Sequence, residues 1–261
     1  LPPQRVLVTG GTGFIGAALV HQLLDAGHTV TLLARNPARA TKQFQARARC
    51  VPSIAALGAE EGFDTVINLA GAPVLGPRWS PKRQALLLAS RVGVTQSLLQ
   101  WLGRAVHKPS TWLQASAIGF YGVRSGDEWL TEASAPGQGF MSTLCQQWEA
   151  SAQPVADQGV RLVVLRLGVV LGPGGALPPM LLPHRLGLGG RLGDGQQALR
   201  QRRVAAGAVG GAQVQVGQLA VEEARHHAGD RMRLPQHHAA MQRQDAVHHE
   251  LEPVHVLHQI Q

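Results

Sequence analysis

Three glycines near the start of the chain have the spacing of a loop that binds a dinucleotide. Gly10, Gly13 and Gly16 directly follow a short apolar segment and open a segment with helical spacing. In such a loop the first glycine permits a tight turn, the second lets the backbone approach a pyrophosphate, and the third lets the helix pack closely. The free N–H groups at Phe14 and Ile15 would face the phosphates. The sequence therefore predicts a phosphate cradle here, with an ordinary glycine-rich turn as the alternative.

The residue after the second apolar segment indicates which dinucleotide would bind. Proteins that bind NAD usually place Asp or Glu there, whereas Arg suits the 2′-phosphate of NADP. This chain reads Ala34, Arg35, Asn36, with no acid. A guanidinium fork matches the geometry of a phosphate dianion. We therefore predict NADP as the cofactor in preference to NAD; the alternative is that Arg35 merely begins a basic loop.

The elements that would position these residues alternate between strand and helix. Apolar segments of strand length lie at 5–9, 29–34, 64–70, 112–116 and 160–166. Segments with helical spacing lie at 14–26, 82–103 and 139–157. Strands that alternate with helices form a parallel sheet, and right-handed crossovers make that sheet doubly wound. We predict an α/β fold with a doubly wound parallel sheet of the Rossmann type.

Composition limits the class of protein. The chain has 261 residues, of which 44% are apolar, enough for one large domain with a smaller lobe. It carries no apolar run long enough to span a membrane and no secretory leader. Cys50 and Cys145 follow no metal or redox spacing. These features predict a cytoplasmic protein that does not bind a membrane.

The net charge of +8 raises the question of a nucleic-acid partner. The densest basic run contains Arg35, Arg39, Lys42, Arg47 and Arg49. A solvated face beside a phosphate site explains such a run better than a nucleic-acid interface. We therefore predict a small-molecule substrate and no nucleic-acid partner.

The last quarter of the chain uses a restricted set of residue types. Residues 196–261 contain no Ser, Thr, Asn, Lys, Cys, Phe, Tyr or Trp. Every residue there except Met232, Met241 and Ile260 can be encoded by a triplet that begins with G or C. A GC-rich gene read out of frame would give this pattern, and we interpret the segment so. The alternative is a disordered extension rich in Ala, Gln and His.

This change in composition suggests how the chain is divided. We predict a Rossmann domain at 1–175, the start of a substrate lobe, incomplete in this chain, at 176–195, and an anomalous tail at 196–261, either disordered or out of frame. The tail contains the histidine pairs 226–227, 237–238 and 248–249, which recur every 11 residues. Imidazole pairs can bind zinc or copper, but no carboxylate or cysteine signature surrounds them. We predict no metal site.

Several short stretches, taken in order, resemble one family. They are residues 8–16 (VTGGTGFIG), 66–72 (VINLAGA), 116–122 (SAIGFYG), 148–150 (WEA), 166–172 (RLGVVLG) and 186–190 (LGLGG). Together they resemble the extended short-chain dehydrogenases/reductases, and more narrowly the atypical branch called epimerase family proteins, over about residues 5–195. That branch is similar to nucleotide-sugar epimerases and binds NADP.

The resemblance also implies where the cofactor would be contacted. The implied residues are Arg35, Leu69, Ala70, Arg91 and Val169. Three of them, Leu69, Ala70 and Val169, would lie at strand ends in any Rossmann core, and Arg91 could instead cap or pair on its own helix. These simpler explanations stay open at this point.

The chain departs from the larger superfamily at the catalytic pair. Short-chain dehydrogenases use a Tyr four residues before a Lys, in which the tyrosine transfers a proton and the lysine lowers its pKa. Counting back from Glu149 places Cys145 and Met141 at these positions, and neither can replace its counterpart. Ser116 resembles the serine that orients the reacting oxygen. Tyr121, the single tyrosine of the chain, could relay a proton, or it could be part of the core.

Three functions remain compatible with these residues. The first is an NADP-dependent oxidoreductase or epimerase-like enzyme that acts on a small polar or sugar-like substrate. The second is a regulatory protein that binds NADP without chemistry, because the usual Tyr and Lys are missing. The third is a non-functional product of a shifted reading frame. We favour the first.

Overall fold

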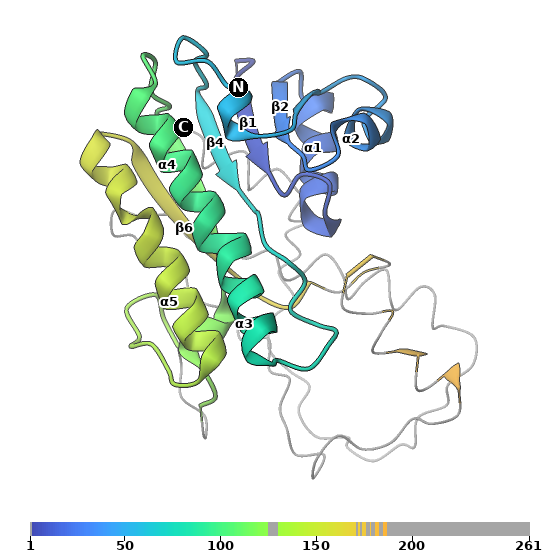
Figure 1. The fold of residues 1–261 in the computed structure, drawn as a ribbon, viewed down its shortest axis with the longest axis vertical. Coiled ribbons are helices and arrows are strands. Elements are labelled where there is room, and N and C mark those ends of the chain that lie inside the picture. Colours follow the sequence, from blue (N-terminus) through green and yellow to red (C-terminus); the bar gives the residue numbers. More distant parts are fainter. Residues whose placement is uncertain are drawn as a thin grey trace, which may run out of the picture.

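The computed structural model describes residues 2–124 and 130–170, together with residues 172, 174, 175, 178, 181, 182, 185 and 186. Its strands are β1 (Arg5–Thr9), β2 (Thr29–Leu33), β3 (Arg49–Val51), β4 (Thr65–Asn68), β5 (Thr111–Ala117) and β6 (Arg161–Leu167). They form one six-stranded parallel sheet in the order β3-β2-β1-β4-β5-β6 (Figure 1). This order, with its reversal beside β1, is that of a doubly wound dinucleotide-binding sheet. The predicted fold class is confirmed.

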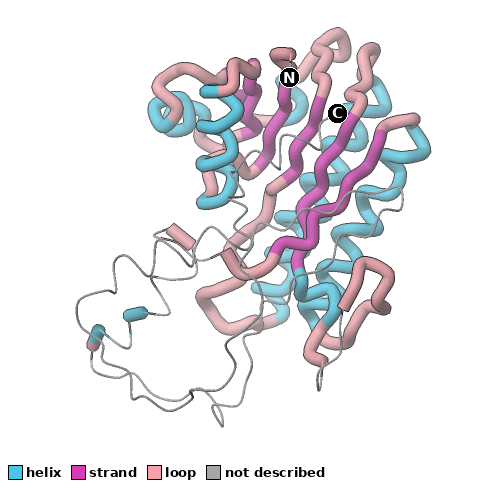
Figure 2. The backbone as a smooth tube through the Cα atoms, turned by 180° about the vertical axis from the view of Figure 1, so that it is seen from behind, coloured by secondary structure: helices cyan, strands magenta, loops and turns pink. Residues whose placement is uncertain are grey.

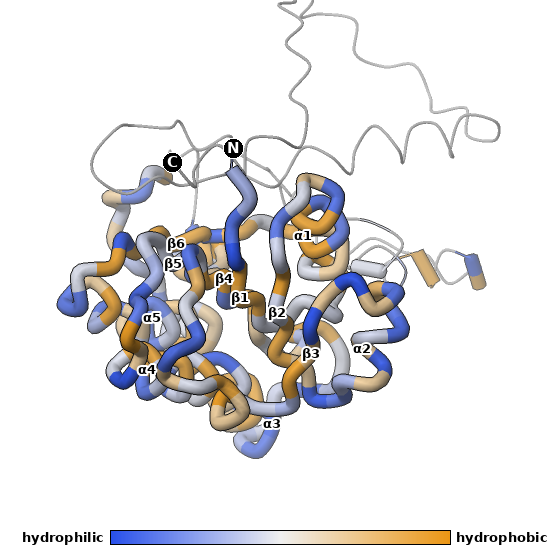
Figure 3. Tube along the Cα trace, turned by 90° about the horizontal axis from the view of Figure 1, so that it is seen from above, coloured by the Kyte–Doolittle hydropathy of each residue, from blue (hydrophilic) through white to orange (hydrophobic). Residues whose placement is uncertain are grey.

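The helices lie in two layers around the sheet. They are α1 (Phe14–Asp25), α2 (Pro37–Gln43), α3 (Pro81–Leu88), α4 (Val94–Arg104) and α5 (Phe140–Ala152). Viewed from above, α1 lies on one side of the sheet and α4 and α5 lie on the other (Figure 3). Seen from behind, the strands lie in front of the layer that contains α4 and α5 (Figure 2). Because all six strands are parallel, each connection returns the chain to the amino end of the sheet, where the next strand begins.

The core fills the space on both sides of the sheet. Side chains alternate along a strand, so Leu7 packs with Trp101 and Trp112 in one layer. Its neighbours Val6 and Val8 pack in the other layer, together with residues of α1. Burial on both faces explains why the strands read as nearly continuous apolar runs.

Two elements were not among those predicted from the sequence. The strand β3 has only three residues, too few for a recognisable pattern. The helix α2 begins after Asn36, whose side chain accepts a hydrogen bond from the Arg39 N–H, and Pro37 occupies its first position. Asparagine as N-cap and proline at the first position are both typical of a helix start. Short elements of this kind are marked by their caps rather than by their periodicity.

Two predicted helices differ in detail from the observed ones. The helix expected at 82–103 is divided by a π-helical turn (Ala89–Gly93) between α3 and α4. The helix expected at 139–157 ends at Ala152, and a 3₁₀ turn (Gln153–Gln158) follows. Pro154 lies at the start of that turn and has no N–H to continue an α-helix.

A buried polar network joins three strands to the π-helical turn. The Thr9 hydroxyl donates to Asn68 Oδ1 at 2.6 Å. Asn68 Nδ2 donates to Thr95 Oγ1 at 2.9 Å and to Gln114 Oε1 at 3.0 Å. The Thr95 hydroxyl in turn donates to the carbonyl of Arg91 at 2.9 Å. The network therefore fixes the π-helical turn against the carboxyl ends of β1 and β4 and the middle of β5.

Ion pairs neutralise part of the basic run. Arg47 pairs with Asp25 at 2.8 Å, and Arg49 pairs with Glu61. Two of the five positive charges in the run are thus matched locally, as expected for a solvated face.

Some predictions concern residues that the structure does not describe. The tail at 196–261 and its histidine pairs lie outside the described residues, as does most of the segment 176–195. Within the described part of the chain, no helix is long and apolar enough to cross a membrane. In the same part, no group of three or more His, Cys, Asp or Glu side chains could hold a metal ion.

His28 should make the stability of the fold depend on pH. Its side chain is 6% exposed, and Nδ1 accepts a hydrogen bond from the Gln4 N–H at 3.0 Å. Burial lowers the pKa of His28 below its ordinary value of 6.5. Below pH 6.5 the unfolded chain therefore binds more protons than the folded chain, and stability falls as the pH falls. We expect a lower free energy of unfolding in urea at about pH 5.5 than at about pH 7.5.

The variant His28→Asn isolates this contribution. Its amide oxygen can accept the same hydrogen bond, but the side chain does not titrate. The loss of stability between the two pH values should be smaller in the variant than in the wild type. Equal losses would show that His28 does not cause the pH dependence.

Candidate dinucleotide site and reacting edge

The three glycines of the phosphate loop at 10–16 differ in what an added side chain would meet. Gly10 has a φ of 70°, and a Cβ there would lie closer than 3.0 Å to the carbonyl oxygen of Leu69. A Cβ at Gly16 would lie equally close to the carbonyl oxygen of Gly10. Among the described residues, a Cβ at Gly13 would meet only that same oxygen, at 3.2 Å. Gly10 and Gly16 are therefore required by the loop itself, whereas Gly13 leaves open space in front of it.

The loop leads directly into α1, whose first turn is open to an anion. Gly13 is the N-cap, so no side chain caps the helix, and the first turn carries no acidic residue. Phe14 is 37% exposed and Ile15 is half-buried at the same end. Unpaired N–H groups and the helix dipole both favour a negative group at such a position. The geometry thus fits the phosphate cradle predicted from the sequence.

The first half of the sheet places the next predicted residues beside this loop. Leu69 and Ala70 follow β4, and the Leu69 N–H donates to the Thr9 carbonyl at 3.2 Å. They therefore pass directly next to Gly10. Arg35 follows β2, on the other side of β1, and its side chain is exposed. All of these residues share the carboxyl edge of the sheet, where ligands of open α/β sheets bind.

Arg91 lies deeper than expected for a residue that contacts a cofactor. It is 8% exposed, and its guanidinium donates to the carbonyls of Leu87 and Ala72, both at 3.1 Å. It also lies 5.0 Å from the centroid of the Trp148 ring. Burial lowers the pKa of Arg91, and among the described residues no carboxylate pairs with it. A contact with the cofactor stays a prediction, but a buried unmatched cation favours an anion nearby.

The segment after β6 returns to the start of α1. Val169 is 41% exposed just beyond the end of β6. Further on, a Cβ at Gly172 or Gly174 would lie closer than 3.0 Å to the ring of Phe14. The ring therefore packs on backbone that only glycine leaves accessible. In this way the structure brings Val169 to the same edge as the phosphate loop.

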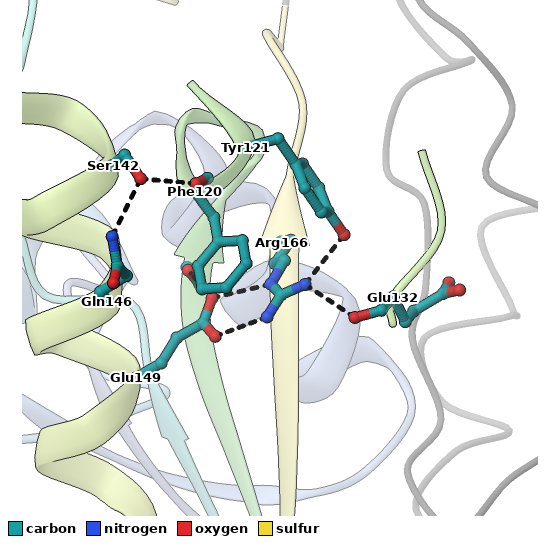
Figure 4. Close-up of polar contacts among 8 residues, drawn as sticks. Phe120, Tyr121, Glu132, Ser142, Gln146, Glu149 and Arg166 are labelled. Carbon is teal, nitrogen blue, oxygen red and sulfur yellow. Dashed lines mark hydrogen bonds and ion pairs between the residues drawn. The ribbon is translucent and has the colours of Figure 1, made fainter. Parts of the chain in front are cut away.

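The two predicted catalytic residues, Ser116 and Tyr121, belong to one buried network at the ends of β5 and β6. Figure 4 shows the part of it formed by Tyr121, Glu149 and Arg166. The Ser116 hydroxyl donates to Glu149 Oε1 at 2.5 Å. Arg166 donates from Nε to Glu149 Oε1 at 2.9 Å and from Nη2 to Oε2 at 2.8 Å. Its Nη1 donates to the Tyr121 hydroxyl at 2.9 Å and to the Glu132 carbonyl at 3.2 Å. Ser116 and Tyr121 are thus connected through a glutamate–arginine pair.

The network is protected from water and strongly paired. The side chains of Arg166 and Glu149 are 12% and 11% exposed, and Tyr121 is 3% exposed. Burial alone would lower the pKa of Arg166, but the hydrogen bonds to Glu149 and Tyr121 outweigh it and raise that pKa. Arg166 therefore stays charged at every pH at which the protein is folded.

Comparison with known proteins identifies the family. Residues 6–187 match the model of the NAD dependent epimerase/dehydratase family. This chain belongs to that family. The resemblance predicted from short stretches of sequence is therefore confirmed.

Relatives within the epimerase/dehydratase family share most of the described part. Epimerase family protein YfhF of Bacillus subtilis is 36% identical over 198 residues, which are 75% of this chain and 65% of YfhF. Human epimerase family protein SDR39U1 is 39% identical over 197 residues, 74% of this chain and 64% of the human protein. The chain thus spans slightly less than two thirds of the length of these curated relatives.

Solved structures show the same core. The crystal structure of human SDR39U1 (isoform 2) with NADPH superimposes with a TM-score of 0.63 at 41% identity, covering 74% of this chain and 63% of that one. A nucleoside-diphosphate sugar epimerase from Corynebacterium glutamicum gives a TM-score of 0.59 at 31% identity, covering 74% of this chain and 39% of that one.

The residues at the usual Tyr and Lys positions face the segment after β5. A Cβ at Gly119 would lie 3.4 Å from Met141 Cε and 3.7 Å from Cys145 Sγ. Burial raises the pKa of the Cys145 thiol, which therefore stays protonated at neutral pH. A thioether and a neutral thiol provide no cation at this position. The charged side chains that hydrogen-bond to the Ser116 and Tyr121 hydroxyls are instead Glu149 and Arg166.

Sequence reasoning used Glu149 only as a landmark for counting and did not single out Arg166. A signal was present, since Arg166 is a charged residue that interrupts the apolar run of β6 after Leu165. Charged residues are seldom buried without a partner. The pattern indicated that some partner existed, although not which one.

Proposed function

We propose that this chain binds NADP and acts as an NADP-dependent oxidoreductase or epimerase on a small polar, sugar-like substrate. The observation that carries the proposal is the phosphate loop, which is open in front of Gly13 and followed by Arg35 at the end of β2. The NADPH bound to human SDR39U1 and the substrate class in the name of the Corynebacterium enzyme support it. The predicted cytoplasmic location stays a prediction.

The described residues fit such a cofactor along the whole carboxyl edge. The first turn of α1 would hold the pyrophosphate, and Leu69 and Ala70 would lie against the adenosine side. Arg35 would pair with the 2′-phosphate through its guanidinium fork. The buried charge of Arg91 would face the same anionic region. When bound, the nicotinamide supplies hydride transfer, chemistry that no side chain provides.

The second half of the sheet would carry the reacting groups. In a doubly wound sheet the half formed by β4–β6 belongs to the second mononucleotide, here the nicotinamide end. Ser116 and Tyr121 lie in that half, and we propose that Ser116 orients the reacting oxygen and Tyr121 relays the proton. Because the Ser116 hydroxyl donates its hydrogen bond to Glu149, its oxygen is left to accept a hydrogen bond. Because Tyr121 accepts from Arg166, its own proton is left to be donated.

A regulatory protein that binds NADP without chemistry is the second candidate. Met141 and Cys145 replace the usual catalytic pair, and the Ser116 and Tyr121 hydroxyls are both engaged and buried. The two candidates differ in hydride transfer. NADPH deuterated at C4, mixed with the protein and a set of nucleotide-linked keto sugars, should give deuterated products detectable by mass spectrometry. Tight NADPH binding with no deuterium in any product would favour the regulatory protein.

Arg35 should set the preference between the two cofactors. A charge-assisted contact with the 2′-phosphate contributes about 1.5–3 kcal/mol, so Arg35→Asp should weaken NADPH binding about tenfold or more. NADH lacks that phosphate and should bind no more weakly to the variant. Titration of nucleotide fluorescence measures both affinities.

Lys108→Asp provides the matched control for Arg35→Asp. It makes the same change in charge at an exposed position before β5, at the opposite edge of the sheet. If both variants weaken NADPH binding equally, the effect comes from net charge and not from Arg35.

A further inference from the structure

We propose that Arg166 and Glu149 are positioning residues, in the place of the missing Tyr–Lys pair. They would position the reacting edge, by which we mean the carboxyl end of β5 with the Ser116 and Tyr121 hydroxyls. They would act through the Ser116 and Tyr121 hydroxyls and touch neither cofactor nor substrate. The inference rests on the proposed function, because it assumes that a nicotinamide lies beside these hydroxyls.

The contacts of Arg166 show why one residue can fix the whole edge. Its three nitrogens make four hydrogen bonds, to Glu149 on α5, to the Tyr121 hydroxyl after β5, and to the Glu132 carbonyl in the loop before α5. Glu149 Oε1 also accepts a hydrogen bond from the hydroxyl of Ser116 on β5. One ion pair therefore ties β5, β6, α5 and two connecting segments together (Figure 4).

The shape of the guanidinium matters as well as its charge. The Arg166 Cζ lies 3.5 Å from the centroid of the Phe120 ring and 5.1 Å from that of Tyr121. A planar, delocalised cation can stack on a ring while its edge makes a bidentate contact with Glu149. Lysine could keep the charge, but it could not make all of these contacts at once.

The position of the pair relates it to the reaction and not only to the fold. Ser116 and Arg166 are opposite each other in the ladder between β5 and β6, at the carboxyl ends of both strands. The pair gives the two hydroxyls opposite tasks, since Ser116 is left as an acceptor and Tyr121 as a donor. A carboxylate can only accept and a guanidinium can only donate, so this pair fixes the direction of the hydrogen bond that each hydroxyl makes.

The single tyrosine of the chain allows a direct test. The full chain, labelled with ¹³C at the phenolic ring carbon of tyrosine, gives one NMR signal, from Tyr121. NADPH alone is the probe, and its affinity is measured in parallel by fluorescence. In the wild type we expect the Tyr121 signal to differ from that of free tyrosine and to shift when NADPH binds.

The variants separate positioning from folding. In Arg166→Met the signal should approach that of free tyrosine and lose its response to NADPH, while the NADPH affinity stays within about threefold. Arg166→Lys should restore part of the response. Arg5→Met, which removes an exposed ion pair with Asp64 at the opposite edge, should behave like the wild type. If Arg166→Met does not fold, Arg166→Lys provides the comparison: its response to NADPH should be weaker than that of the wild type, and a full response would overturn the inference.

Each outcome has a definite meaning. If NADPH binds the wild type without moving the Tyr121 signal, the pair is structural and the present inference is overturned while the proposed function stands. The same conclusion follows if Arg166→Met keeps the full response. If NADPH does not bind the wild type at all, the proposed function fails and the inference fails with it.

Discussion

Gly13→Val should abolish NADPH binding and leave the fold intact. In the part of the chain that the structure describes, a Cβ at this position meets a single atom, the Gly10 carbonyl oxygen at 3.2 Å. Gly13 has a φ of −77°, which valine tolerates. The side chain would instead occupy the space in front of the first turn of α1. Losing two charge-assisted hydrogen bonds to a phosphate costs about 3–6 kcal/mol, so affinity should fall at least about a hundredfold.

Two measurements on the purified variant test this expectation. Thermal unfolding should show a melting temperature close to that of the wild type, and fluorescence titration should show no saturable NADPH binding. Gly103→Ala is the matched control, because nothing lies within 4 Å of its Cβ and α4 contains it. That control should bind normally and gain up to about 1 kcal/mol of stability. A Gly13→Val protein that folds and binds NADPH like the wild type would contradict the assignment of the loop.

Breaking the Arg166–Glu149 pair should destabilise the fold more than any surface substitution. Both side chains are nearly buried, and either one left alone is a charge without a partner. Removing one member of such a pair typically costs about 3–5 kcal/mol. Glu149→Met and Arg166→Met should therefore each shift the urea midpoint strongly downward with little change in slope.

A double variant shows how much of that loss comes from the unmatched charge. Arg166→Met combined with Glu149→Met removes both charges, and its cost should be clearly smaller than the sum of the two single costs. Arg5→Met removes an exposed ion pair, and its cost should stay below about 1 kcal/mol. Single variants of the buried pair that cost no more than Arg5→Met would show that water reaches the network.

The sequence predicted those parts of the fold whose conformation is determined by residues close together along the chain. The glycine loop, the strand before it and the helix after it are encoded within residues 5–26, so local pattern was sufficient. The elements α2 and β3 escaped because seven and three residues are too few to establish a periodic apolar pattern. The π-helical turn escaped because the apolar spacing of residues 82–103 continues through it without a break.

The candidate reacting edge was predictable only in part. Ser116 and Tyr121 could be found from their place at the end of a strand. Their partners could not, because Ser116 and Glu149 are 33 residues apart and Tyr121 and Arg166 are 45 apart. Arg91 could be singled out from the family resemblance, but its hydrogen bonds to the carbonyls of Leu87 and Ala72 and its contact with the Trp148 ring could not be predicted from the sequence.

The most direct test of the account is the titration of the wild-type chain with NADPH and, separately, with NADH. Energy transfer from the tryptophans to the bound nicotinamide reports binding of either cofactor. The open cradle at Gly13 together with Arg35 predicts saturable binding of both, with NADPH about tenfold tighter or more. Equal affinities would contradict the assignment of Arg35, and no saturable binding of either cofactor would contradict the dinucleotide site itself.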